Sequence, residues 1–194
     1  DQVSKGRELR LKQEHFFVSA TLQDALRRHF VQHRTLANLH EKAVFQLNDT
    51  HPALAVPEMM RLLVDERGMG WDEAWAIASR CFAYTNHTVL PEALEQWPVS
   101  LLERVLPRHL QILYEINDRL LSEVRSRWPG DEDRVGRMSL VAEGSDRRVR
   151  MANVAIAGSF SVNGVSALHS KLVREQLFPD FAALWPEKFN NKTN

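Results

Sequence analysis

Two short polar clusters, each at the end of an apolar run, hold the residue types that could do chemistry in this sequence. Asn48-Asp49-Thr50-His51 follows the apolar run 43–47, and Thr85-Asn86-His87-Thr88 follows a second run. Their carboxylate, imidazole, amide and hydroxyl groups are directional donors and acceptors of the kind that bind a polyhydroxylated ligand. In open α/β sheets, ligands bind outside the carboxyl ends of strands. The pattern predicts a site for a polar ligand, with the alternative that both clusters only cap helices and satisfy loop backbone.

Three other features give weaker hypotheses. His29 and His33 lie four residues apart on a predicted helix, a spacing that could hold a metal ion. No third ligand is evident, so we interpret the pair as a solvated helix face and expect no metal site. The segment 158–164 has two glycines but matches neither a dinucleotide fingerprint nor a P-loop, and we interpret it as a helix break that allows close packing. Asn117, within an apolar helix, is interpreted as a satisfied core amide.

The elements that must position these clusters follow from the spacing of apolar residues. Helices are predicted over 7–30, from Pro52 to about Gly68, over 71–82, and from Pro107 to Trp128. Strands are predicted over 43–47 and 83–89, two short strands within 137–150, and a helical run over 151–177 that is broken near Asn163-Gly164. Long helices around a few short strands indicate the α/β class, although two or three strands make a poor sheet by themselves.

Composition narrows the classes of function. The 194 residues are 44% hydrophobic, which suits one compact domain or a large part of a bigger one. Lys plus Arg number 25 and Asp plus Glu number 25, so nothing points to nucleic acid or an anionic membrane as a partner. The single cysteine, Cys81, excludes an internal disulfide and is interpreted as a buried, inert thiol.

The ends and the hydropathy of the chain suggest a compartment. The first residues are polar and of mixed charge, unlike a secretory signal, and no stretch of about 18 apolar residues occurs. We therefore expect a cytoplasmic protein. Both ends lack the looser linker of a natural domain boundary, so we expect that residues 1–194 form a single segment that is incomplete at both ends.

Several stretches, taken in order, carry a resemblance to a known family. They are Glu8-Leu9-Arg10-Leu11-Lys12-Gln13-Glu14, Gln46-Leu47-Asn48-Asp49-Thr50-His51-Pro52, Ala83-Tyr84-Thr85-Asn86-His87-Thr88, Leu106-Pro107-Arg108-His109-Leu110, Trp128-Pro129-Gly130-Asp131 and Asn191-Lys192-Thr193-Asn194. The sequence resembles the α-1,4-glucan (glycogen, starch or maltodextrin) phosphorylases along essentially its whole length. Phe160 stands where animal members have a histidine, which suggests a bacterial-type sequence.

The resemblance implies a much longer enzyme of the GT-B type, built from two α/β domains, of which this chain would be the helix-rich later part of the N-terminal domain. Such an enzyme cleaves α-1,4-glucans with inorganic phosphate and releases glucose 1-phosphate with retained configuration. It uses pyridoxal 5'-phosphate, linked to a lysine of the second domain that is not in this chain, and it is usually a homodimer. By itself the segment is expected to be inactive.

The resemblance also assigns roles to residues. His87 matches the histidine that binds the 6-hydroxyl of the transferred glucosyl unit, with its backbone carbonyl near the anomeric centre. Asn194 matches the asparagine that shares this contact. The residues that match the polar lining of the adjoining channel are Arg10, Asp49, His51, Thr88 and Glu95.

Two rival interpretations remain open at this point. One is a free-standing, non-enzymatic sugar-binding or interaction module derived from a phosphorylase. The other is a transferase of the same architecture that uses a nucleotide-sugar donor, although such enzymes do not usually combine Asn-Asp-Thr-His-Pro with Thr-Asn-His-Thr.

Overall fold

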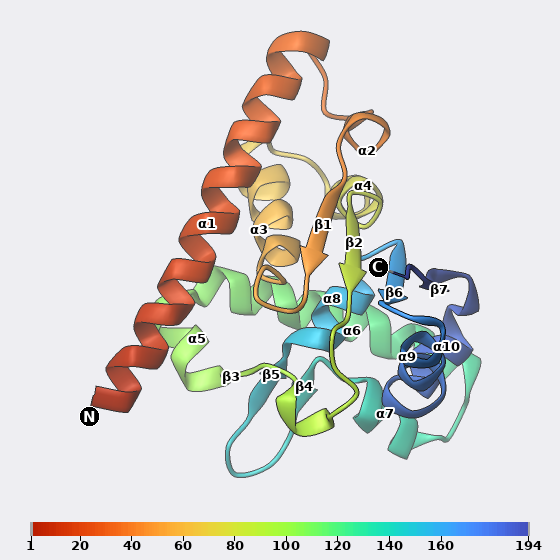
Figure 1. The fold of residues 1–194 in the computed structure, drawn as a ribbon. Coiled ribbons are helices and arrows are strands. Elements are labelled where there is room, and N and C mark those ends of the chain that lie inside the picture. Colours follow the sequence, from red (N-terminus) through yellow and green to blue (C-terminus); the bar gives the residue numbers. More distant parts are fainter. Residues whose placement is uncertain (1, 194) are drawn as a thin grey trace.

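Two small sheets and the helices around them make up the fold, which the computed structural model describes for residues 2–193, with side chains from residue 5 onward. The larger sheet is parallel and four-stranded, in the order β1-β2-β6-β7, and the smaller is antiparallel and three-stranded, in the order β3-β5-β4 (Figure 1). The strands are β1 Phe45–Asn48, β2 Phe82–Thr85, β3 Gln96–Pro98, β4 Val141–Ala142, β5 Arg148–Arg150, β6 Ser161–Gly164 and β7 Phe189–Asn191.

The helices carry most of the residues. They are α1 Gln2–His33, α2 Leu39–Lys42, α3 Ala55–Arg61, α4 Trp71–Ala78, α5 Val99–Val105, α6 Pro107–Arg127, α7 Glu132–Met138, α8 Met151–Ala157, α9 Ala167–Leu172 and α10 Pro179–Leu184. Wider π-helical turns, Leu62–Glu66 and Val173–Leu177, extend α3 and α9. In Figure 1, α1 runs along one side of the molecule, and α3 lies between it and β1. Among residues 2–193, no helix combines the length and the apolar character needed to cross a bilayer.

Helix α6 illustrates how local sequence sets these elements. Pro107 occupies its first turn, where a missing N–H costs nothing, and Gly130 closes the following turn with φ of 85°. One face of the helix is buried at Leu110, Leu113, Ile116, Leu120 and Val124. This 3.6-residue spacing confirms the predicted helix.

The predicted α/β class is confirmed, but the strand assignment was incomplete. The predicted break near Asn163 is the strand β6, which pairs with β2 on one side and with β7 on the other. Phe82, predicted as helical, is the first residue of β2. The helix predicted from Pro52 begins at Ala55, and its N-cap is Leu54, so no residue of the first polar cluster caps it.

Three smaller predictions have different outcomes. Asn117 is a satisfied amide: its Oδ1 accepts from Leu140 N (2.7 Å) and its Nδ2 donates to Ser139 Oγ (3.3 Å). Cys81 is buried as predicted, and burial raises the pKa of its thiol to about 12. The solvated interpretation was wrong for His29, which is buried and donates from Nε2 to Asn38 Oδ1 (3.0 Å).

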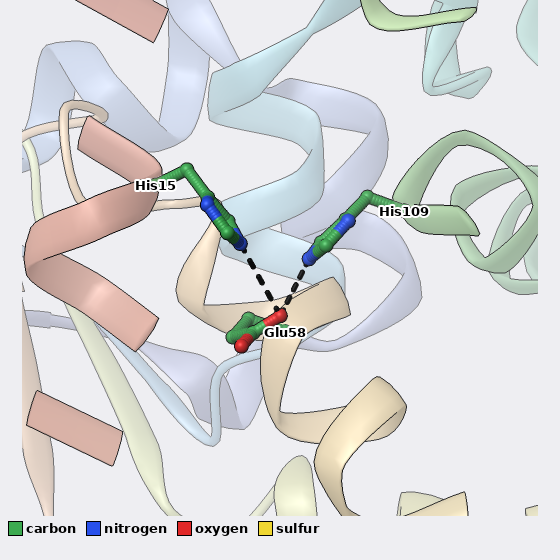
Figure 2. Close-up of side chains that lie close together, drawn as sticks. All are labelled: His15, Glu58 and His109. Atoms are coloured by element: carbon green, nitrogen blue, oxygen red, sulfur yellow. Dashed lines mark hydrogen bonds and ion pairs between the residues drawn. The ribbon is translucent and has the colours of Figure 1, made fainter. Parts of the chain in front are cut away.

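A buried ionic cluster joins three helices: His15 of α1, Glu58 of α3 and His109 of α6. In Figure 2 both imidazoles point at the Glu58 carboxylate. His109 Nε2 lies 2.5 Å and His15 Nε2 lies 3.6 Å from Glu58 Oε2. Arg61 donates to both carboxylate oxygens, from Nε (2.8 Å) and Nη2 (2.9 Å), and Ser19 Oγ donates to Oε1 (2.7 Å).

These donors decide the state of the Glu58 carboxyl. Burial alone would raise its pKa, but the hydrogen bonds from Arg61, His109 and Ser19 hold that pKa well below its ordinary value. Because the fixed guanidinium of Arg61 already covers both oxygens, a metal ion would have to displace a permanent positive charge. We therefore interpret this His–Glu–His–Arg cluster as an ionic joint between helices.

Replacing Glu58 by Gln should destabilise the fold by about 3 kcal/mol, because Arg61 and His109 lose the buried charge that they pair with. Since the folded-state pKa of Glu58 is lowered, its contribution is present above the unfolded value of 4.5 and is lost as the pH falls further. Urea unfolding followed by circular dichroism should show a wild-type-minus-variant difference that narrows in acid. Glu66→Gln, which removes an exposed partner of the same Arg61, is the control and should change stability by less than about 0.5 kcal/mol.

Gly158→Ala should destabilise the protein by about 1–3 kcal/mol, because a Cβ at this position would lie 2.5 Å from both γ-carbons of the buried Val56. The interpretation of 158–164 as a close-packing segment predicts this clash. Val56→Ala in the same chain removes those methyl groups and should recover part of the loss. Gly136→Ala in α7, where a Cβ meets nothing within 4 Å, should instead be neutral or stabilising by up to about 1 kcal/mol. Equal unfolding midpoints for the two alanine variants would contradict the packing argument.

Candidate functional site

The two polar clusters meet at one edge of the parallel sheet. β1 and β2 run in the same direction, with Asn48 paired in register with Thr85, and their arrowheads point the same way in Figure 1. The clusters touch directly, because His87 Nε2 donates to Asn48 Oδ1 (2.5 Å). The imidazole of His87 is otherwise exposed at this edge.

Strand β6 extends the same edge through an amide that sequence reasoning missed. Thr85 Oγ1 accepts from Gln46 Nε2 (2.8 Å) and donates to Asn163 Oδ1 (2.9 Å), so side chains link β1, β2 and β6. Asn86 N donates to the carbonyl of Asn163 (2.9 Å). The only sequence signal for Asn163 was its place in a short break between helices.

Strand β7 completes the edge. It runs parallel to β6, with Asn191 paired with Gly164, so its carboxyl end lies at the edge where β1 and β2 end. Lys192 N donates to the carbonyl of Gly164 (3.1 Å) as the chain leaves. Asn194, predicted as a sugar-binding residue, lies outside the described residues.

Part of each cluster serves the backbone, as the alternative interpretation had it. Asp49 has φ of 63°, a left-handed conformation that Asp tolerates, and its Oδ1 accepts from Thr50 N (2.6 Å). Asn86 is buried; its Oδ1 accepts from Thr88 N (3.0 Å), and its Nδ2 donates to the hydroxyl of Tyr84 (3.0 Å). These bonds hold the loop that presents the exposed His87.

A second group of predicted residues lies together beside α1. Arg10 Nη2 donates to His51 Nδ1 (3.1 Å) and to Glu95 Oε2 (3.1 Å). The same guanidinium donates from Nε to Glu14 Oε1 (3.1 Å). Two distant segments therefore converge on one arginine of α1. His51, two residues beyond Asp49, connects this group along the chain to the sheet edge.

Glu14 belongs to this group although we had assigned it no role. Burial, and after it the neighbouring negative charge of Glu95, raise the pKa of its carboxyl to about 7 against the lowering effect of Arg10. The sequence signal was its position four residues after Arg10, on the same face of a helix. Its second partner, Glu95, lies too far along the chain for that spacing to reveal.

The arrangement can bind hydroxyl groups. Imidazole, carboxylate, amide and guanidinium groups lie at or beside the carboxyl edge of a parallel sheet, where ligands of α/β proteins bind. Of the seven predicted residues, Asp49, His87 and Thr88 follow the strand ends and Arg10, His51 and Glu95 form the neighbouring group.

Comparison with known proteins shows which proteins this chain is similar to. The family model for carbohydrate phosphorylases matches residues 1–194. The chain is 54% identical to the glycogen phosphorylase of Synechocystis sp. and 55% identical to that of Chlamydia trachomatis. It is also 55% identical to the muscle form of glycogen phosphorylase of Homo sapiens.

Each of these alignments covers the whole chain but only part of the relative. The covered share is 23% of the Synechocystis protein and 24% of the other two, so the chain spans about a quarter of their length. A family match over every residue, with more than half of the aligned positions identical, is decisive for kinship. The chain belongs to the carbohydrate phosphorylase family.

Proposed function

We propose that this chain is a segment of a glycogen or starch phosphorylase and supplies part of its glucosyl pocket. The observation that carries the proposal is the identity of 54–55% to glycogen phosphorylases along the entire chain. The parent enzyme would phosphorolyse α-1,4-glucans reversibly, with glucan and inorganic phosphate as substrates and glucose 1-phosphate as product. The segment would be the later part of the N-terminal domain of a GT-B glycosyltransferase.

In this proposal the strand-end residues orient the sugar that is transferred. His87 binds the 6-hydroxyl through its imidazole, and its backbone carbonyl faces the anomeric centre, where an oriented dipole favours developing positive charge. The bond from His87 to Asn48 holds the ring at the sheet edge. Asn194 shares the 6-hydroxyl, and the residues that line the adjoining channel are Arg10, Asp49, His51, Thr88 and Glu95.

The family's cofactor, pyridoxal 5'-phosphate, does not fit the described lysines. Lys188 is the one lysine among residues 5–193 that is not exposed, and burial lowers the pKa of its ammonium to about 8. It lies 3.7 Å from the centre of the Trp185 ring and directly precedes β7, at the end of the strand away from the candidate site. We therefore assign the cofactor to a lysine elsewhere in the parent enzyme.

The remaining assignments follow from the parent family. We place the parent enzyme in the cytoplasm, as a homodimer that needs neither nucleic acid nor a membrane. A free-standing sugar-binding module is the alternative. It would be favoured if the isolated chain folded stably and bound maltodextrin without the rest of the enzyme.

His87→Ala in the full-length enzyme should lower kcat/KM for glucose 1-phosphate by about tenfold to a hundredfold, because a hydrogen bond to the substrate is lost. The role of the imidazole can be isolated with 6-deoxyglucose 1-phosphate, which lacks the 6-hydroxyl. This analogue should react more slowly than glucose 1-phosphate with the wild type, and the variant should no longer distinguish the two. A variant that still discriminates fully would assign the 6-hydroxyl to other groups. Unchanged thermal unfolding would show that the loss is not one of folding.

The isolated chain should release no glucose 1-phosphate from glycogen and phosphate, with or without added pyridoxal 5'-phosphate, since groups from both domains are needed at once. It should also bind a hydrophobic dye. Leu9, Phe16 and Phe17 on α1 are 57%, 69% and 71% exposed, and Phe16 borders a cavity of about 910 Å³ beside that helix. The full-length enzyme should bind much less dye per mole. A monomeric, dye-free chain with a cooperative melt would support the free-standing module.

A further inference from the structure

Two glutamates beside the candidate sugar channel share one arginine as hydrogen-bond donor, and both side chains have little exposed surface. The side chains of Glu14 and Glu95 are each 11% exposed. Arg10 donates to one oxygen of each carboxyl, both at 3.1 Å. Glu14, His51 and Glu95 each have a polar atom within 4.8 Å of the others. The two carboxyl groups are therefore neighbours with little exposed surface, beneath the more exposed side chains of Arg10 and His51.

The charges of this group do not balance when both acids are ionised. Arg10 contributes one positive charge and donates from Nη2 to His51 Nδ1, so this ring nitrogen is the acceptor of that bond. Two carboxylates against one guanidinium leave one negative charge in excess. Glu14 Oε2 and Glu95 Oε1 are buried and have no hydrogen-bond partner in the part of the chain that the structure describes. Uncompensated buried charge is costly, and neighbouring carboxylates relieve it by keeping one proton between them.

Glu14 is the better place for that proton. Glu95 Oε2 accepts from Arg10 Nη2, the same nitrogen that donates to His51, so an ionised Glu95 keeps Arg10 in the place from which it reaches His51. Burial and the nearby Glu95 together raise the pKa of Glu14 to about 7, which places its ionisation in the physiological range.

We propose that Glu14 is a positioning residue whose carboxyl is protonated at and below neutral pH, donates a hydrogen bond to Glu95, and so keeps Glu95, Arg10 and His51 in the arrangement that lines the sugar channel. This inference rests on the proposed function for its effect on catalysis, but not for the proton itself. The groups that face Glu14 are Arg10 on its own helix, His51 in the turn after β1, and Glu95 in the segment before β3.

The consequence is that the affinity of the channel for sugar falls as the pH rises. When Glu14 loses its proton, the two carboxylates repel each other and Glu95 loses a donor. Glu95 then loses its fixed position, which displaces Arg10 Nη2 and with it the donor to His51, so sugar binding should become poorer above neutral pH. Because one proton is involved, the affinity can change by no more than about tenfold per pH unit.

The test uses the full-length enzyme with its cofactor and measures KM for glucose 1-phosphate from about pH 6 to about pH 8. Glu14→Gln keeps a donor to Glu95 but does not titrate. We expect similar KM values for wild type and E14Q in acid, and a wild-type KM about threefold to tenfold higher than that of E14Q at the alkaline end. Taking the ratio of the two enzymes cancels the ionisation of the substrate phosphate. Parallel profiles for the two enzymes would overturn the proposal.

Two further variants test whether Glu14 positions its neighbours through its proton or only fills space beside them. Glu14→Ala removes both the proton and the donor, so its KM should be raised at every pH, including the acid range where E14Q matches the wild type. Glu8→Gln removes the same charge from the same helix, where Glu8 pairs with Lys12 and Arg104, and its profile should run parallel to that of the wild type. If E14Q were impaired as much as E14A in acid, Glu14 would act by packing or charge alone.

Infrared difference spectroscopy detects the protonated carboxyl group of Glu14 independently of catalysis. The wild type should show a carboxylic-acid carbonyl band that titrates near neutral pH and is missing from E14Q. If the full-length protein lacked phosphorylase activity but showed this band, the proposed function would fail while the shared proton stood. Absence of the band at about pH 6, in a protein that is active, would refute the assignment of the proton to Glu14.

Discussion

The parallel pairing of β2 with β1 and β6 is the constraint on which the candidate site depends. Parallel neighbours end at the same edge, so residues that are far apart in sequence become adjacent wherever the strands stop. Thr85 sits at the centre of this edge, bonded to Gln46 on one side and to Asn163 on the other. A slip of one residue in β2 would turn Thr85 to the opposite face and break both bonds. The position of His87 beside Asn48 is thus a product of register as much as of sequence.

Two glutamates show how neighbours, rather than burial alone, decide the state of a carboxyl group. Glu58 and Glu14 both lose water on folding, which raises the pKa of each. Arg61 and His109 overcome that cost for Glu58 and keep it ionised in a joint between helices. Glu14 has another acid as its neighbour and only a share of Arg10, so its pKa stays raised. The first arrangement suits a permanent contact, and the second suits a group that changes state near neutral pH.

The sequence predicted the long helices well, because a buried face repeats every 3.6 residues over many turns, as in α6. It failed for β6 and β7, whose few residues are rich in Ser, Asn and Gly and show no clear alternation. These strands exist because neighbours supply hydrogen bonds, which no local pattern records. The same limit applies to the site: both strand-end clusters were visible in the sequence, whereas Glu14 and Asn163 acquire their meaning from partners more than seventy residues away.

The chain spans about a quarter of its relatives, and this shapes what its residues can contribute in the proposed enzyme. In that proposal the sheet edge would supply groups that bind hydroxyls and orient the sugar, whereas phosphate and the cofactor would be bound by the rest of the enzyme. Positioning of the substrate and electrostatic stabilisation of the transition state can act together only when this segment is assembled with the rest of the enzyme. The ionic joint at Glu58, the register of β2 and the acid pair at Glu14 all act within this chain, where they keep the donors and acceptors of the sheet edge and of the group beside it in a fixed arrangement.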